Sequence, residues 1–353
     1  MQTLSITLPE KKYSIMIKKD LLSHIAKHIS ENHHSKKIAV VTDENVDALY
    51  GSILMNSLSE QGFLVTKIVV PPGEKSKSMA MLEYLYGKFL DFKISRSDLI
   101  IAFGGGVVGD LVGFAASTFL RGVPFIQIPT TLLAQIDSSI GGKVAVNLPN
   151  GKNLIGTFYH PDAVYIDPKL LETLPIRVLR DGIAEVIKYS AISETSLFED
   201  LTRYHDEEEL LENIQSVIAI CCQIKQTFVE KDEKDTGLRM ILNFGHTIGH
   251  AIENYFNYET YTHGEAVAIG MARITTQSEA LGITKLGTAQ TLIQLIEKYG
   301  LPTTATDYNH QALLESMTLD KKNSTSGLHL ILLAAMGKSL IQKVKPDEIH
   351  LYL

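Results

Sequence analysis

The chain has 353 residues, which corresponds to about two domains. Its 45% hydrophobic and 21% charged residues are typical of a globular protein and exclude disordered, collagen-like and coiled-coil chains. With 33 basic and 40 acidic residues the net charge is −7, so we expect no nucleic-acid partner. The two cysteines, Cys221 and Cys222, are adjacent and unsuited to a disulfide framework, and the N-terminal sequence lacks a signal or transit pattern. We therefore expect a cytoplasmic protein.

Short β-branched segments alternate with amphipathic segments through the first half of the chain. The predicted strands cover residues 37–42, 65–70, 99–103, 125–128 and 163–166, and the predicted helices cover 47–61, 77–92 and 109–120. This alternation is typical of parallel strands joined by crossover helices, so we predict a doubly wound α/β domain over residues 1–168. Residues 3–17 alternate like a hairpin that covers one edge of that sheet.

The strand pattern stops after Asp167, and helical periodicity replaces it. Predicted helices cover residues 182–192, 207–230, 244–255, 265–281 and 289–299, and a late strand pair covers 328–335 and 339–344. The second domain, residues 169–353, is thus predicted to be mainly α-helical. Because no repeat or flexible linker separates the halves, we expect the active site in a cleft between them.

A glycine-rich segment joins the predicted strand 99–103 to the following helix. Gly104, Gly106 and Gly109 have the spacing G-x-G-x-x-G, which lets a pyrophosphate approach the backbone. The motif departs from the standard dinucleotide fingerprint, because it does not follow the first strand and no acidic residue ends a strand about 20 residues later. Close helix–strand packing is therefore an alternative role for these glycines. Five glycines within 99–120 also indicate a strand, a turn and a packed helix instead of a membrane span.

Polar segments end two other predicted strands. Asp43 follows the strand 37–42, where its carboxylate could accept hydrogen bonds from a ribose, and PPGEKSK at 71–77 follows the strand 65–70. Three consecutive strand ends thus carry glycines or short polar groups, which favours a nucleotide site.

Acidic and histidine residues in the second half have the spacing of a metal site. His246 and His250 are four residues apart on a predicted helix, and His263 opens the next helix. Thr247 occupies the place of the catalytic glutamate in H-E-x-x-H, which argues against a zinc protease. Glu185, with His263 and one or both of the other histidines, could bind a divalent cation. Independent core or cap roles for the histidines are the alternative.

Basic residues near turns of this acidic chain form a further candidate group. They are Lys143 and Lys152 near the glycine-rich segment, and Lys225, Arg239, Lys321 and Lys322 in the helical half. If they converge, the natural ligand is a small anion that bears phosphate or carboxylate groups. Any one of them alone is more typical of a solvated surface residue.

Nine linked segments resemble the 3-dehydroquinate synthase family. They include PPGEKSK at 71–77, GGGVVGD at 104–110, AEVIK at 184–188, NFGHTIGH at 243–250 and HGE at 263–265. The match runs in order from about Asp43 to Lys322. One departure is Asp235, which stands where the family commonly has glutamate.

The resemblance implies a cytoplasmic, homodimeric lyase that uses NAD and Zn²⁺, with Co²⁺ as a substitute, on a Rossmann-like first domain. The implied reaction belongs to the shikimate pathway, which leads to chorismate and the aromatic amino acids. It converts 3-deoxy-D-arabino-heptulosonate 7-phosphate to 3-dehydroquinate and phosphate through transient oxidation, phosphate elimination, re-reduction and intramolecular aldol closure.

The resemblance also implies site residues by motif match. The implied zinc ligands are Glu185, His246 and His263. The residues implied to contact substrate are Asp137, Lys143, Asn153, Lys188, Lys225, Arg239, Asn243, His250 and one of Lys321 or Lys322, with Arg121 reaching the phosphate from the neighbouring subunit. The residues implied to hold NAD are Asp43, Asn45, Glu74, Lys77, Gly105, Gly106, Val107, Asp110, Thr130, Thr131, Asp137, Lys143 and Lys152. Lys188 and His250 are the candidates for moving protons or stabilising an oxyanion.

Three other functions fit part of this pattern. A metal-dependent polyol or alcohol dehydrogenase would release NADH at each turnover, but the basic residues argue against a neutral polyol. Another sugar-phosphate cyclase would share nearly every motif, and substrate profiling distinguishes it. A nucleotide-binding regulatory protein without turnover would not need the three presumed metal ligands together with Lys188.

Overall fold

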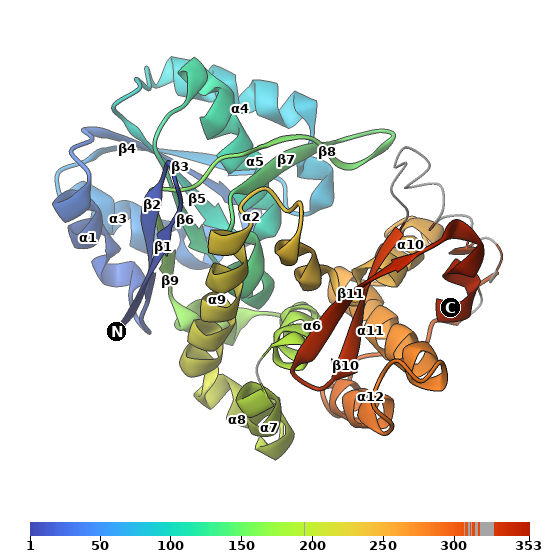
Figure 1. Cartoon of the computed structure of the whole chain (residues 1–353). Helices are drawn as coiled ribbons and strands as arrows, with labels where there is room; N and C mark the ends of the chain where they lie inside the picture. Colours follow the sequence, from blue (N-terminus) through green and yellow to red (C-terminus); the bar gives the residue numbers. More distant parts are fainter. Residues whose placement is uncertain (194, 307, 310, 312, 315–316, 318–327) are drawn as a thin grey trace. The chain divides into compact units, whose positions relative to one another are not determined.

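The computed structural model describes residues 1–193, 195–306, 308–309, 311, 313–314, 317 and 328–353. The chain divides into two compact units, Met1–Leu174 and Pro175–Leu353 (Figure 1). Within the described ranges, no helix is both long and apolar enough to cross a bilayer. The predicted substrate residues Lys321 and Lys322 lie outside the described residues.

The first unit, every residue of which is described, is built on a seven-stranded sheet with the order β1-β2-β9-β6-β5-β3-β4. Its strands are β1 (Gln2–Thr7), β2 (Lys12–Ile17), β3 (Lys37–Asp43), β4 (Leu64–Val70), β5 (Leu99–Gly104), β6 (Phe125–Pro129) and β9 (Ala163–Ile166). Neighbouring strands are parallel except β1 and β2, which form an antiparallel hairpin at one edge. The predicted α/β fold with a parallel sheet is confirmed.

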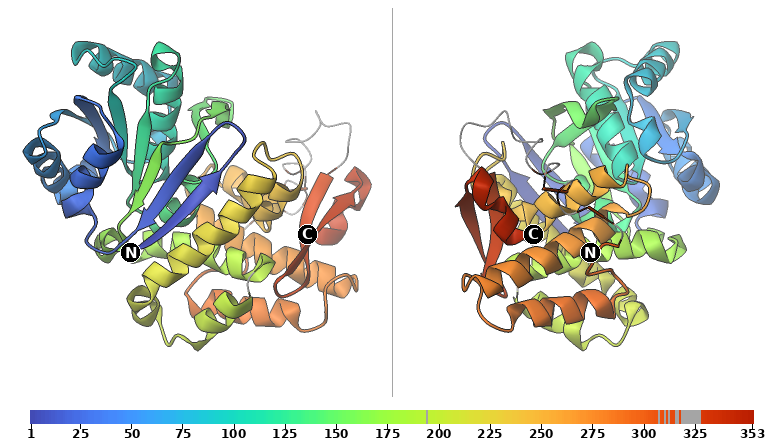
Figure 2. Two further views of the ribbon diagram at one scale, coloured as in Figure 1. Left: turned by 60° about the vertical axis from the view of Figure 1, so that its left-hand side comes forward. Right: turned by 90° about the vertical axis from the view of Figure 1, so that its right-hand side faces the viewer.

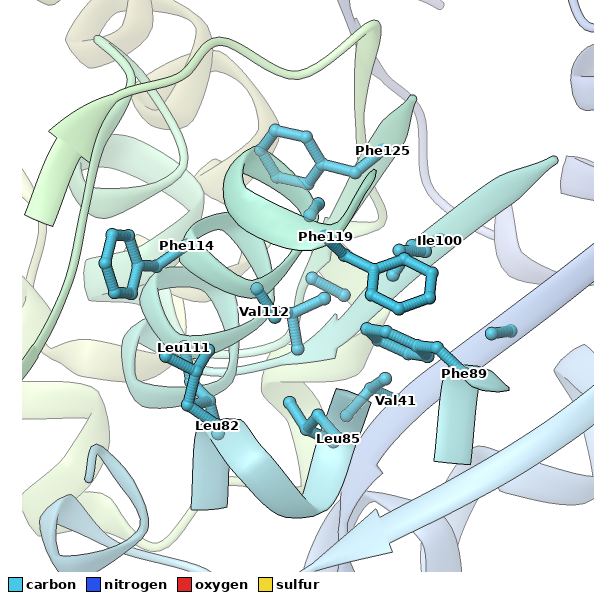
Figure 3. Packing of buried hydrophobic residues seen from close by; sticks show 14 of the residues in the cluster. Val41, Leu82, Leu85, Phe89, Ile100, Leu111, Val112, Phe114, Phe119 and Phe125 are labelled. Carbon is cyan, nitrogen blue, oxygen red and sulfur yellow. The ribbon is translucent and has the colours of Figure 1, made fainter. Parts of the chain in front are cut away.

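Helices cover both faces of this sheet. They are α1 (Ile25–Asn32), α2 (Glu44–Val46), α3 (Ser52–Glu60), α4 (Met79–Asp91) and α5 (Gly106–Thr118), with short 3₁₀ or π-helical segments at η1 (Leu22–His24), η2 (Asp47–Gly51), η3 (Glu74–Ser76), η4 (Phe119–Arg121), η5 (Ala134–Ser138) and η6 (Pro168–Thr173). Consecutive residues Val40 and Val41 of β3 enter two different cores. Figure 3 shows one of them, which contains Val41 together with Leu85 and Phe89 of α4 and Leu111 of α5. Burial on both faces explains why these strands are continuously apolar.

A second hairpin in this unit differs from the sequence prediction, which assigned no strand here. The strands β7 (Lys143–Leu148) and β8 (Gly151–Phe158) pair antiparallel, and both contact α5. Because most of β8 is exposed, its sequence lacks the alternation that marks a half-buried strand. The hairpin carries Lys143, Lys152 and Asn153, three of the predicted site residues.

The second unit is mainly helical, as predicted. Its elements are α6 (Ile176–Ile192), α7 (Thr195–Arg203), α8 (Glu207–Glu212), α9 (Ile214–Lys231), η7 (Leu238–Asn243), α10 (His246–Tyr255), α11 (His263–Ala280), α12 (Thr288–Lys298), β10 (Leu328–Ala335), β11 (Lys338–Val344) and η8 (Pro346–Tyr352). The predicted helix 207–230 is two helices, because Asn213 leaves helical geometry (φ −99°, ψ 4°) and its amide donates to the Glu209 carbonyl at 2.9 Å. The predicted late strand pair is present as an antiparallel hairpin.

The packing of α11 organises this unit. This helix lies against α6, α10 and α12 (Figure 2). A close approach of α10 and α11 requires glycine at Gly245, whose φ is +79° and where an added β-carbon would lie 2.5 Å from the Met271 side chain. As a result, the first residues of α10 and α11 lie beside the middle of α6.

Candidate active site

One face of α6 carries four charged residues at helical spacing. Arg177, Asp181, Glu185 and Lys188 are separated by four, four and three positions. The side chains of Glu185 and Lys188 are 0% and 1% exposed and form an ion pair. A fully buried charged pair costs desolvation free energy, so it is more typical of a functional site than of a stabilising contact.

Two histidines complete a cluster around Glu185. Its Oε1 atom lies 3.4 Å from His246 Nε2 and 3.7 Å from His263 Nε2. One ligand atom from each of the three residues lies within 4.8 Å of the others. The exposed His250 borders the cluster, with its ring centroid 5.4 Å from that of His246 and 6.0 Å from that of His263. The structure therefore brings together all four residues that the motif match selected here.

The outer nitrogen of each clustered imidazole has a protein acceptor. His246 Nδ1 lies 3.1 Å from the Phe244 carbonyl oxygen, and His263 Nδ1 lies 3.3 Å from Oε2 of Glu253. In the neutral imidazoles these bonds favour the tautomer in which Nδ1 carries the proton, which leaves the Nε2 lone pair for a cation beside Glu185. One carboxylate and two imidazoles oriented in this way are a ligand set that suits a catalytic zinc ion with an open coordination position.

The start of α11 is tied to α6. The carboxylate of Asp181 accepts a hydrogen bond from the backbone N–H of Gly264. Thr262 and Glu265 form a capping box at the same helix end, and Arg177 donates to both Glu265 oxygens, at 2.8 and 2.7 Å. These contacts fix His263, the first residue of α11, against the helix that carries Glu185.

The two clustered histidines are shifted in opposite directions. Burial lowers the pKa of His246 to about 3, against the attraction of Glu185. Burial also lowers the pKa of His263, but hydrogen bonds to Glu185 and Glu253 and the charges of both carboxylates outweigh it and raise that pKa to about 10. The surroundings of His263 therefore favour positive charge, which is the electrostatic condition for binding a cation. Burial is the main cause that raises the pKa of Asp181 above its ordinary value.

Further basic residues come from elements that pack on α6. Lys225 lies in α9 and Arg239 in η7, and α6, α9 and η7 contact one another. Both side chains are buried, and Arg239 Nη1 donates to the Glu233 carbonyl at 2.7 Å. Asn243, the last residue of η7, is exposed. Asp235, which stands where the resembled family commonly has glutamate, has a left-handed backbone conformation with φ +58°.

The glycine-rich segment of the first unit has two roles. An added β-carbon at Gly104 would lie 2.7 Å from the rigid Val108 side chain, so helix–strand packing requires glycine there. An added β-carbon at Gly109 would lie 2.8 Å from the end of the Gln127 side chain, so glycine there gives that side chain room. Gly105 and Gly106 open α5, where backbone N–H groups and the helix dipole favour an anion. The packing explanation thus accounts for part of the G-x-G-x-x-G pattern and leaves the residues at the helix start for ligand contact.

A polar network connects predicted nucleotide residues in this unit. Lys77 Nζ lies 2.7 Å from Asp110 Oδ2 and 2.5 Å from Asn153 Oδ1, and the Lys77 side chain is buried. Asn147 of β7 donates to Glu74 at 2.7 Å and accepts from the Asn153 backbone at 2.8 Å. Sequence reasoning missed Asn147 because the hairpin that carries it was not predicted.

The other predicted nucleotide residues lie in separate local structures. Asp43 Oδ1 accepts the backbone N–H groups of Asn45 and Val46 and caps α2, while Thr131 Oγ1 accepts that of Ala134. The remaining members are Val107 in the first turn of α5, buried Thr130 after β6, Asp137 in η5, exposed Lys143 in β7 and half-buried Lys152 in β8. Arg121, at the end of η4, is exposed.

Sequence reasoning also missed the outer residues of the histidine cluster. Glu253 is seven positions after His246 and three after His250, so all three share one face of α10. Helical spacing could have identified it. Asp181 was missed in the same way. It lies four positions, about one helical turn, before Glu185 on α6.

Comparisons with known proteins identify the family. The family profiles described as 3-dehydroquinate synthase N-terminal and C-terminal match residues 67–181 and 182–323. The 3-dehydroquinate synthase of Clostridium acetobutylicum is 52% identical over 353 residues, which are 100% of this chain and 99% of that protein. A structure of 2-epi-5-epi-valiolone synthase from Streptomyces hygroscopicus with NAD⁺ and Zn²⁺ bound is 27% identical, with a TM-score of 0.88 over 97% of this chain and 96% of that one.

A second structure supports the fold alone. It is a 2-deoxy-scyllo-inosose synthase complexed with carbaglucose-6-phosphate, NAD⁺ and Co²⁺, which is 24% identical to this chain. Its TM-score is 0.89, over 99% of this chain and 98% of that chain. Taken with the family profiles and the 52% identical relative, the match spans both units, and the chain belongs to the 3-dehydroquinate synthase family.

Proposed function

We propose that this enzyme is a carbon–oxygen lyase that converts 3-deoxy-D-arabino-heptulosonate 7-phosphate to 3-dehydroquinate and phosphate. The observation that carries the proposal is the buried cluster of Glu185, His246 and His263 beside Lys188, in a chain that is 52% identical to a 3-dehydroquinate synthase over its full length. The reaction places the enzyme in the shikimate pathway toward the aromatic amino acids.

The two units have different proposed roles. We assign NAD binding to residues 1–168, through Asp43, Asn45, Glu74, Lys77, Gly105, Gly106, Val107, Asp110, Thr130, Thr131, Asp137, Lys143 and Lys152. We assign metal and substrate binding to residues 169–353, with Glu185, His246 and His263 as ligands of Zn²⁺ or Co²⁺. Together, bound NAD and the metal supply a reversible two-electron oxidation and Lewis acidity.

The charged side chains around the cluster handle the anionic substrate. Loss of phosphate breaks a C–O bond and removes a proton from the neighbouring carbon, which places negative charge on an oxygen. We assign stabilisation of that charge to the ammonium of Lys188 and proton transfer to His250, the exposed imidazole at the edge of the cluster. Asp137, Lys143, Asn153, Lys225, Arg239, Asn243 and Lys321 or Lys322 are assigned to bind and orient the substrate.

The backbone of the turn that carries Arg121 is strained, which supports a functional role for this residue. Leu120, Arg121 and Gly122 all have positive φ, at +50°, +67° and +119°. For the two non-glycine residues this conformation costs on the order of 1–2 kcal/mol each, so the fold must hold them there. Arg96 does so in part, because its Nε donates to the Leu120 carbonyl at 2.9 Å. We assign the exposed Arg121 to the phosphate site of a partner subunit in a cytoplasmic homodimer.

The assay that tests the function supplies the heptulosonate phosphate with a trace of NAD⁺. We expect many equivalents of phosphate per NAD⁺ without accumulation of NADH, because the cofactor is regenerated within each turnover. Chelator treatment or Glu185→Gln should abolish phosphate release while circular dichroism keeps the helical signal. One NADH per product would identify a dehydrogenase instead, and preference for another sugar phosphate would identify a different cyclase.

A further inference from the structure

Glu253 is a buried acid outside the residues that the proposed function assigns to NAD, metal and substrate. It lies in α10, and its side chain is 7% exposed. Burying a charged carboxylate destabilises a folded protein unless a partner stabilises its charge. The Nδ1 atom of His263, 3.3 Å from its Oε2, is one such partner.

The two clustered histidines are held by different kinds of acceptor. His246 Nδ1 is oriented by a neutral backbone carbonyl, that of Phe244, two residues earlier in the chain. His263 Nδ1 is oriented by a carboxylate that comes from another helix, α10. The charged acceptor makes the imidazole more electron-rich, so its Nε2 becomes a stronger donor to a cation. Glu253 therefore acts on the Nε2 atom that points toward Glu185.

We propose that Glu253 is a positioning residue for the metal site. Its carboxylate holds the His263 ring with Nε2 toward Glu185 and strengthens that nitrogen as a ligand. This inference rests on the metal site of the proposed function, and it adds a residue that acts through His263 without touching the metal.

The test measures metal affinity without substrate. The purified full-length protein is titrated with Zn²⁺ against a chromogenic chelator, for the wild type, Glu253→Gln and Glu253→Leu. We expect about 10- to 100-fold weaker Zn²⁺ binding in Glu253→Leu and a smaller loss in Glu253→Gln, which keeps one oxygen acceptor but no charge. The number of ions bound per chain should stay the same, because Glu253 is not a ligand. Co²⁺-loaded protein should show a shifted visible absorption spectrum in both variants.

A matched substitution separates positioning from general stability. Glu279, at the end of α11, accepts the backbone N–H groups of Gly287 and Ala289 at 3.0 and 2.8 Å. Glu279→Gln should therefore lower the melting temperature and leave Zn²⁺ affinity unchanged. If Glu253→Leu does not fold, Glu253→Gln and Glu253→Asp still decide the question, and Glu253→Asp should bind Zn²⁺ more tightly than Glu253→Gln because it restores the charge.

Three results would overturn the inference. Equal Zn²⁺ affinity in the wild type and folded Glu253 variants would show that the carboxylate does not act through His263. If Glu279→Gln weakens Zn²⁺ binding as much as a Glu253 variant with the same loss of melting temperature, Glu253 has a structural role. Loss of one bound ion per chain would make Glu253 a ligand itself, in the second group that it forms with His250 and His263. Failure of the proposed function is distinguishable, because then the wild type itself would not bind Zn²⁺ through Glu185.

Discussion

Three glutamates of the helical unit show how surroundings decide the role of one side chain. Glu185 is fully buried beside Lys188 and two imidazoles, which makes it a candidate ligand. Glu253 is buried against the outer nitrogen of a histidine. Glu279 accepts backbone N–H groups near the start of α12 and acts as a cap. In the sequence alone all three are acidic residues on predicted helices.

The cap formed by Glu279 predicts a pH-dependent stability. Hydrogen bonds from the backbone of Ala289 and Gly287 lower the pKa of Glu279 below its ordinary value of 4.5. A carboxylate with a lowered folded-state pKa stabilises the protein above the unfolded-state value, and that contribution disappears as pH falls through the folded-state pKa. Glu279→Gln should thus lower the free energy of unfolding by about 1 kcal/mol at neutral pH. In urea denaturation the difference from the wild type should shrink below about pH 4.5, and a constant difference would contradict this origin.

Two helical glycines show that element packing, and not propensity, decides where glycine is needed. At Gly264, in the first turn of α11, an added β-carbon would lie 2.3 Å from the backbone oxygen of Asp181 in α6. At Gly87, in α4, an added β-carbon meets no atom of the described residues within 4 Å. The first glycine permits contact between two helices of the site, whereas the second only adds backbone freedom to the unfolded chain.

Alanine at these two positions should therefore have opposite effects. Gly87→Ala should raise the free energy of unfolding by about 0.5–1 kcal/mol and leave phosphate release unchanged. Gly264→Ala should lower the free energy of unfolding by about 1–3 kcal/mol and weaken Zn²⁺ binding, because α11 must move away from α6 and carries His263 with it. Thermal denaturation and Zn²⁺ titration of both variants provide the check. Equal effects of the two substitutions would contradict the close approach of α6 and α11.

For the assembled enzyme, we propose that each active site combines residues of two subunits. Arg121 stands on an exposed turn whose backbone is held in an unfavourable conformation, a feature that is common at functional positions. In a dimer with twofold symmetry, each subunit would lend its Arg121 to the other and receive one in return.

This exchange can be tested by complementation. Arg121→Ala and Glu185→Gln should each be nearly inactive, and a mixed dimer isolated by two affinity tags should recover about half of the wild-type activity. One of its two sites then combines an intact Glu185 with the intact Arg121 of the other subunit. An inactive mixed dimer would indicate that Arg121 serves its own subunit, and a mixed dimer of Arg121→Ala with wild type is the control for assembly.

The parallel sheet, the change to a helical second half and a candidate metal site at Glu185, His263 and the histidines of residues 246–250 could all be predicted from the sequence, and the family motifs selected His246 among those histidines. These features depend on local periodicity and on motifs of contiguous residues, which a linear sequence displays directly. Tertiary structure alone decided the β7–β8 hairpin, the break at Asn213 and the contact between Glu253 and His263. Exposed strands, side-chain bonds to the backbone and contacts between distant helices depend on packing that no local pattern encodes.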